Sequence, residues 1–193
     1  LCMHACPNDA ITMEGSMPNS AGFYPRSIGP MVHGKLGIAE ENSGKLVSLV
    51  RQQAKLIAEE ENKDLIIIDG PPGIGCPVIA AITGADLVLA VTEPTLSGIH
   101  DLERVLGVAG HFNLRAMVCV SKFDINTENT EKIKEYCRER NIEVVGEIPY
   151  DPIVTRAMVA GQTITEYDSG VVTDIIKRMW ARIEAGLGNG FER

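Results

Sequence analysis

The sequence predicts an α/β fold with a doubly wound, mainly parallel sheet. Apolar runs of strand length alternate with helical patterns from about residue 31 onward. The strand-like runs are apolar on both faces, which is typical of parallel strands covered by helices on each side. In this architecture ligands bind beyond the carboxyl ends of the strands. The residues that directly follow each strand are therefore the first candidates for a functional site.

The predicted elements follow one another in regular order. A helix is expected over 46–61, where apolar residues recur with a helical period and Asn42 or Ser43 can cap the first turn. Ser97 is the predicted cap of a later helix, and Pro152 the predicted first residue of another. We expect strands at 64–70, 87–92, 115–121 and 143–148, and further helices near 77–84, 97–111, 126–140, 152–160 and 169–186.

Composition excludes several classes of protein. The net charge of −8 argues against a general nucleic-acid binder, which needs Lys and Arg to neutralise phosphates. Charges such as Asp86 interrupt the longest apolar stretches, so we expect no membrane span. The five cysteines are odd in number, which favours a reducing cytoplasm over a disulfide framework. Cys119 and Cys137 lie in apolar patterns and are expected to be buried.

The chain divides into three predicted parts. Residues 1–27 hold a short cysteine segment and a linker rich in Pro, Gly and Ser; residues 28–186 form the α/β domain, and 187–193 a tail. The chain begins at Leu1, without Met, so we expect its true N-terminus to be missing.

Asp69 ends the first apolar run and precedes Gly70, Pro72, Gly73 and Gly75. A carboxylate at a strand end can hold Mg²⁺ directly or through water beside a nucleotide phosphate. Glycines let backbone N–H groups approach phosphate oxygens closely. The alternative is a tight turn with a capping Asp, but the combination of residues favours a phosphate site.

The later strand ends carry weaker signals. Lys122 and Asp124 stand where nucleotide-binding proteins often place Asn-Lys-x-Asp, whose Asp contacts the purine ring and whose Lys packs over it. Here Ser121 replaces the Asn, and a surface Lys with a helix-start Asp is the alternative. The loop at 149–151 can wall the base or ribose, or be an ordinary junction. Two segments, 29–36 and 39–46, imitate the phosphate-binding loop but end in Leu where a hydroxyl is required.

Taken together, the motifs resemble the MinD/ParA group of P-loop ATPases, and among these the members with an inserted ferredoxin domain. The stretches that carry the resemblance are LCMHACPNDAI, AEENSGKLVSLVR, LIIIDGPPGIGCPVIAAITGADLVLAVTEPTLSGIHDLERV, VSKFDIN and GEIPYDPIVTRAMVAGQTITEY. The resemblance implies that ATP and Mg²⁺ bind and that two protomers enclose the nucleotide in a homodimer. It implies that Asp69 is catalytic within the metal and water network and that Gly73 and Gly75 lie near the γ-phosphate. It also implies that the residues near the base are Lys122, Asp124, Pro149, Tyr150 and Asp151.

The first residues, Cys2-Met-His-Ala-Cys6-Pro7, fit the last two ligands of a ferredoxin run. A [4Fe–4S] cluster takes four thiolates, so we expect the parent protein, but not this chain alone, to hold one stably. The P-loop Lys of the resembled family has no counterpart here. We therefore expect an ATPase coupled to electron transfer or cluster delivery, with a redox or iron–sulfur partner protein. The alternatives are a non-enzymatic ferredoxin-type carrier or scaffold, and a membrane-positioning MinD-like ATPase. Against the latter, the apolar stripe of the last helix is expected to pack in the core.

Overall fold

The computed structural model describes residues 30–34 and 44–188. The chain forms two compact units, residues 1–68 and 69–193. The first unit contains α2 (Gly44–Glu60). The elements of the second unit are α3 (Cys76–Ile82), β1 (Leu87–Thr92), α4 (Leu96–His111), β2 (Arg115–Ser121), the 3₁₀ turn η1 (Phe123–Ile125), α5 (Thr127–Glu139), β3 (Glu143–Ile148), α6 (Pro152–Val159), α7 (Ile164–Tyr167) and α8 (Val171–Leu187). The predicted domain boundaries remain predictions.

In the first unit, α2 (Gly44–Glu60) agrees closely with the helix predicted over 46–61. Its predicted caps, Asn42 and Ser43, lie outside the described residues. The strand predicted over 64–70 is wrong. These residues belong to neither strand pairing of the described sheet, and Ile67 is 76% exposed. An apolar run becomes a strand only when a neighbouring strand accepts its backbone hydrogen bonds, and the described residues supply none.

The second unit is built on a parallel sheet in the order β1-β2-β3. All three strands agree with the residues predicted from sequence. Leu87 pairs with Arg115 at the start of the first ladder, and the second ladder ends where Ser121 pairs with Ile148. Because the strands are parallel and adjacent, their carboxyl ends lie side by side, and the loops that follow them share one edge.

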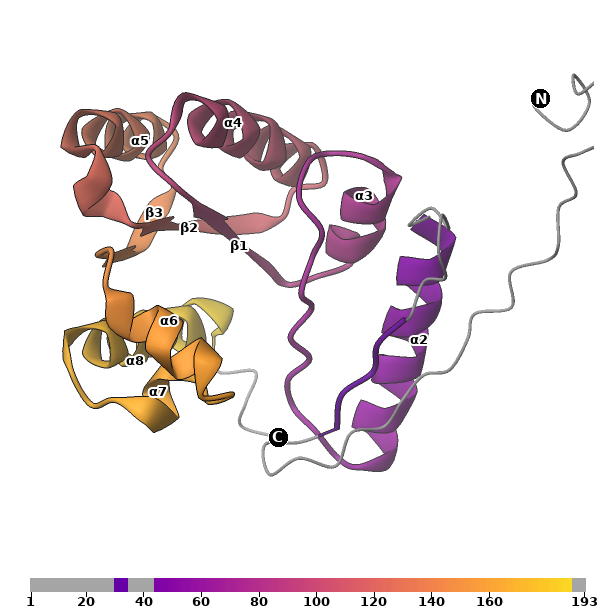
Figure 1. Ribbon diagram of the computed structural model, residues 1–193. Helices are drawn as coiled ribbons and strands as arrows, with labels where there is room; N and C mark the ends of the chain where they lie inside the picture. The colour runs from indigo at the N-terminus through magenta and orange to yellow at the C-terminus, as the bar shows by residue number, and fades with distance from the viewer. Residues whose placement is uncertain (1–29, 35–43, 189–193) are drawn as a thin grey trace, which may run out of the picture. The chain divides into compact units, whose positions relative to one another are not determined.

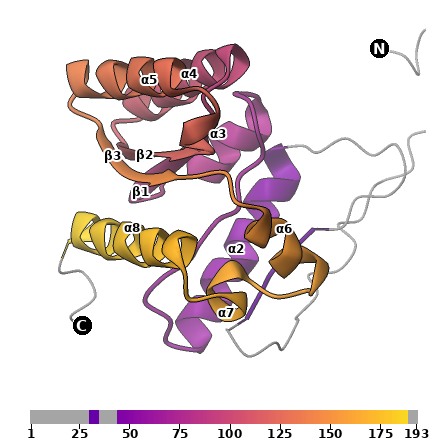
Figure 2. The ribbon, with the colours of Figure 1, turned by 60° about the vertical axis from the view of Figure 1, so that its left-hand side comes forward.

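Helices cover both faces of this sheet (Figures 1 and 2). One face packs against α4 and α5, where Val118, Val120 and Ile133 are wholly buried. The opposite face packs against α8 through Met117, which forms a cluster with two other buried residues, Val145 and Ile183. The doubly wound arrangement predicted from strands apolar on both faces is therefore present in the described residues. β2 is the central strand, and four consecutive residues from Met117 to Val120 are buried.

Local chemistry explains where most helices begin. Asn126 caps α5 by accepting a hydrogen bond from the Asn129 N–H, and Asp151 caps α6 directly before Pro152. The predicted cap Ser97 is wrong, because it lies within α4. Thr95 has the extended backbone of a cap, and its Oγ accepts a hydrogen bond from the Gly98 N–H at 3.0 Å.

The short helix α7 was not predicted. Thr163 and Glu166 form a capping box at its start, in which the Glu166 carboxylate accepts a hydrogen bond from the Thr163 N–H at 3.1 Å. The sequence Thr-Ile-Thr-Glu holds the recognised spacing for this motif, and this signal was available in the sequence.

Two further predictions concern buried residues. Cys119 and Cys137 are buried, as predicted, and burial raises the pKa of the Cys119 thiol to about 11. The apolar stripe of α8 packs only in part: Val172 and Ile183 are buried, whereas Val171 is 67% exposed at the helix start. The prediction that the whole stripe packs in the core is therefore wrong for Val171 and for Trp180, which is 36% exposed. Among the described residues, no helix combines the length and apolar character needed to cross a bilayer.

Candidate functional site

The loops at the carboxyl edge of the sheet are joined to one another by side-chain bonds. The loop after β1 contributes Glu93, whose Oε1 lies 2.6 Å from Lys122 Nζ in the loop after β2. The loop after β3 is joined to the same segment, because the Tyr150 N–H donates to Asp124 Oδ1 at 2.7 Å. Three segments that are far apart in the sequence thus form one polar rim at the strand ends.

Lys122 reaches Glu93 from an unusual backbone conformation. Its φ of 54° and ψ of 41° are left-handed, a region in which residues other than Gly are uncommon. The conformation ends β2 abruptly and starts η1, in which Asp124 is the central residue. The sequence signal Ser121-Lys122-Phe123-Asp124 therefore marks a sharp turn that carries both charged groups to the edge of the sheet.

A buried amide supports the rim from behind. Asn129 is 7% exposed, and its Nδ2 donates to the carbonyl oxygen of Pro94 at 3.1 Å. Thr130, also buried, donates through Oγ1 to the carbonyl oxygen of Phe123 at 2.7 Å. Both residues lie in the first turn of α5, which therefore holds the loops after β1 and β2 in place.

The loop after β3 completes the edge. Asp151 accepts a hydrogen bond from the Ile153 N–H at 2.9 Å, so its carboxylate caps α6. Tyr150 is 56% exposed, and its backbone rather than its ring makes the contact with Asp124. Pro149 precedes them at the end of β3. Of the predicted base-side residues, the structure brings together Lys122, Asp124, Tyr150 and Asp151.

The predicted phosphate loop is placed separately. Asp69 and Gly70 are exposed, Gly73 has a φ of 89°, and Gly75 is the extended N-cap of α3. Within the described residues, no hydrogen bond or ion pair joins the side chain of Asp69 to the rim. The structure therefore brings the base-side predictions together with one another but not with Asp69.

Sequence reasoning missed two residues of the rim. Glu93 directly follows an apolar run, as Asp69 does, and this position was the signal available in the sequence. Asn129 offered no comparable signal, because an Asn in the first turn of a helix is common. Its role follows from the contact between α5 and the loop after β1.

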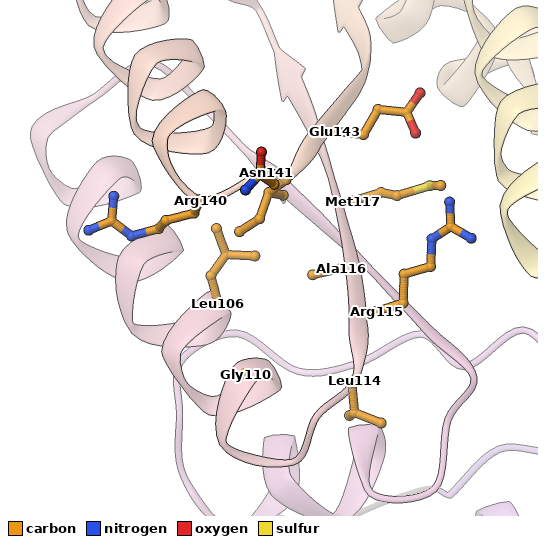
Figure 3. A pocket seen from close by; sticks show the side chains of 10 residues that line it. Leu106, Gly110, Leu114, Arg115, Ala116, Met117, Arg140, Asn141 and Glu143 are labelled. Atoms are coloured by element: carbon orange, nitrogen blue, oxygen red, sulfur yellow. The ribbon is translucent and has the colours of Figure 1, made fainter.

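A hollow of about 500 Å³ lies at the opposite, amino end of the sheet. Figure 3 shows that Arg115 and Arg140 line it but point away from each other. Each charged group there already has a protein partner: Arg115 donates to the Gly186 carbonyl, Arg140 lies over the Tyr136 ring, and Glu143 pairs with Arg182. No group of charges converges on this hollow, and it makes a poorer candidate than the rim.

Iron–sulfur ligation was predicted at Cys2 and Cys6, which lie outside the described residues. In the part of the chain that the structure describes, no three His, Cys, Asp or Glu side chains are grouped to hold a metal ion.

Several known proteins resemble this chain in sequence. No protein-family model matches the chain. An uncharacterised protein of Methanocaldococcus jannaschii, MJ0578, is 29% identical over 166 residues, which cover 86% of this chain and 55% of the relative. An uncharacterised ATP-binding protein of the same organism, MJ0547, is 28% identical and covers 51% of this chain and 37% of its own length. The sporulation initiation inhibitor Soj of Bacillus subtilis is 30% identical and covers 62% of this chain and 51% of Soj.

Solved structures of MinD proteins resemble the fold of this chain. The MinD cell division protein of Aquifex aeolicus matches with a TM-score of 0.59 and 23% identity, over 74% of this chain and 61% of that chain. MinD of Pyrococcus horikoshii, complexed with Mg-ADP, matches with a TM-score of 0.60 and 16% identity, over 78% of this chain and 60% of that one. The chain shares the MinD fold. It spans about half the length of the curated relatives it matches.

Proposed function

We propose that this chain is the base-side part of a MinD-like ATPase and that an adenine nucleotide binds at the carboxyl edge of β1, β2 and β3. The observation that carries the proposal is the pair of bonds Glu93–Lys122 and Asp124–Tyr150, which join the three loops at that edge. In parallel α/β sheets this edge is where ligands bind. The MinD-like fold, the ATP-binding relative MJ0547 and the Mg-ADP bound by Pyrococcus horikoshii MinD support a nucleotide as the ligand.

Within this proposal, Lys122, Asp124 and the loop at 149–151 surround the base. The Lys122 stem provides an apolar surface, because its ammonium group is paired with Glu93. The Asp124 carboxylate orients the loop at 149–151 through the Tyr150 N–H. The Asp124 carboxylate and the Tyr150 peptide group would thus fix the distance between the two loops beside the base.

Asp69 and the glycines that follow it are proposed for the phosphate side. The residues present fit Mg²⁺ and phosphate: Asp69 is exposed, and no atom lies within 4 Å of the place that a Cβ on Gly73 would take. Mg²⁺, when bound, neutralises negative charge on the phosphates. Asp69 would hold the ion through water, and the backbone of Gly70, Gly73 and Gly75, with Pro72 shaping the turn, would approach the phosphate oxygens.

Calorimetric titration of the 193-residue chain with Mg-ATP and with ATP in EDTA tests the proposal. We expect wild-type protein to bind ATP, and we expect Asp69→Asn to remove the Mg²⁺-dependent part of the affinity, because the amide carries no charge. Asp64→Asn is the matched control: Asp64 is also exposed but precedes the apolar run. Failure of wild-type protein to bind ATP in either condition would contradict the proposal.

A homodimer is proposed with the nucleotide site. Large apolar side chains are exposed near the carboxyl edge, with Leu96 at 79%, Ile125 at 61% and Tyr150 at 56% exposure. A second copy would cover them. Light scattering with and without ATP tests this, and a monomer in both conditions would contradict it.

Iron–sulfur coupling is proposed for the parent protein on a separate observation, the Cys2-x3-Cys6-Pro7 motif. The proposed parent is a cytoplasmic ATPase that delivers electrons or a cluster to a redox or iron–sulfur partner protein. Anaerobic reconstitution of the parent should give cluster absorbance that is lost in Cys2→Ala. Unchanged absorbance in that variant would remove the motif from the proposal.

A further inference from the structure

The ion pair between Glu93 and Lys122 needs an explanation beyond stability. The two residues are 29 positions apart, and their side chains are 47% and 40% exposed. An exposed ion pair contributes little to stability, because water and salt screen the charges. The energy of the pair therefore gives little reason to fix two long side chains at 2.6 Å.

The backbone of Lys122 adds a second observation. Four residues other than Gly have positive φ in the described part of the chain: Asn62, Asn113, Lys122 and Asn141. Three of them are Asn, which tolerates the left-handed region through its short polar side chain. Lys has no such advantage, and a strained conformation of this kind persists only where its surroundings enforce it.

The Glu93 end of the pair is held firmly. The buried Asn129 bonds to the carbonyl oxygen of the next residue, Pro94. A Cβ on Gly98 would meet the carbonyl oxygen of Glu93, so the first turn of α4 is packed directly against this peptide. Glu93 therefore projects from a fixed backbone, and its carboxylate is an anchor to which Lys122 is drawn.

We propose that Glu93 is a positioning residue of the nucleotide site, which holds Lys122 in its left-handed conformation so that the lysine stem lies against the base. This inference rests on the proposed function. Glu93 does not touch the nucleotide itself. Because the Glu93 carboxylate neutralises the Lys122 ammonium group, Lys122 contributes its apolar stem rather than its charge.

The direction in which one substitution changes ATP affinity distinguishes this role from a phosphate-binding role for Lys122. We expect Glu93→Gln to weaken the binding of ATP and of adenosine by the same factor, roughly threefold to tenfold, because both ligands carry the base. If Lys122 instead serves as a free cation for phosphate, Glu93→Gln should strengthen ATP binding and leave adenosine unchanged. Either that result or unchanged affinity for both ligands overturns the inference.

Glu128→Gln is the matched control. Glu128 pairs with Lys132 at 2.7 Å in the exposed first turn of α5, so it has the same chemistry without a bond to Lys122. We expect this variant to bind ATP and adenosine as wild-type protein does. A similar loss in both variants would indicate a general effect of charge and overturn the specific role of Glu93.

A readout without nucleotide separates this inference from the proposed function. The Ile125 N–H donates to the Lys122 carbonyl at 3.1 Å, and its hydrogen exchange therefore reports the turn. We expect Glu93→Gln, but not Glu128→Gln, to accelerate this exchange and to shift the backbone coupling constant of Lys122. If wild-type protein binds no nucleotide, the proposed function fails while these two measurements still decide whether Glu93 positions Lys122. Unchanged exchange and coupling would overturn the inference.

Discussion

At the carboxyl end of the sheet, side chains join one loop to the next, whereas at the amino end they join strands to the elements beside them. Glu93 bonds to Lys122 and Asp124 to the Tyr150 N–H, so neighbouring loops are tied across the strand ends. At the amino end, Glu143 bonds to Arg182 of α8, and Arg115 to the carbonyl of Gly186 in the same helix. The first pattern fixes the shape of an edge, and the second fixes a helix to the sheet.

This difference shows that the size of a hollow does not by itself indicate a functional site. The amino end holds a hollow of about 500 Å³, yet its charged groups already have partners within the fold. The carboxyl end holds loops that side-chain bonds join to one another, and the backbone of one lysine there, Lys122, has a left-handed conformation. A strained residue with a fixed partner is a better indication of a site than volume alone.

The largest expected effect tests the core that both ends share. Ile133 of α5 is wholly buried against the sheet, and Ile133→Ala should lower the free energy of unfolding by about 3 kcal/mol through lost contacts and a cavity. Ile125→Ala, at a site that is 61% exposed, should cost less than about 1 kcal/mol. Urea denaturation of both variants measures this. Equal losses would show that the packing described for α5 is wrong.

The next effect concerns the first turn of α4 at the carboxyl end. A Cβ on Gly98 would meet the Glu93 carbonyl, so Gly98→Ala should destabilise the protein by about 2 kcal/mol and disturb the rim. Gly107→Ala in the same helix meets no atom within 4 Å and should stabilise by about 0.5–1 kcal/mol through helix propensity. Thermal unfolding of the pair should therefore give shifts of opposite sign. Shifts of the same sign would contradict the close contact at Glu93.

A smaller effect tests the tie between the loops after β2 and β3. Asp124→Ala removes the acceptor of the Tyr150 N–H and should cost about 1 kcal/mol, with faster hydrogen exchange at Tyr150. Asp124→Asn keeps an oxygen acceptor and should retain most of the protection. Exchange followed by NMR compares the two variants, and equal protection in wild-type protein and Asp124→Ala would remove this tie from the rim.

The smallest effect is expected at the amino end. Arg140 lies 3.7 Å from the centroid of the Tyr136 ring and is partly exposed, so Arg140→Ala should cost about 0.5 kcal/mol or less. Its ATP affinity, measured by the same titration as above, should equal that of wild-type protein. A marked loss of ATP binding would move the candidate site from the carboxyl end of the sheet to the amino end.

The sequence by itself determined the three strands of the second unit, all of its helices except α7, and most of the base-side residues. Period and apolar character are local properties, and they located β1, β2 and β3. Turn residues after each strand then marked Lys122 and Asp124, because parallel strands place their carboxyl ends at one edge.

Only the tertiary structure decided which of these residues act together. The apolar run at 64–70 has the composition of a strand, but strand pairing depends on a neighbour that composition cannot supply. Glu93 and Asn129 belong to the site because of contacts between residues that are distant in the sequence. Glu93 bonds to Lys122, 29 positions away, and Asn129 bonds to Pro94, 35 positions away. Such contacts are set by how helices pack on the sheet, and no local pattern in the sequence records them.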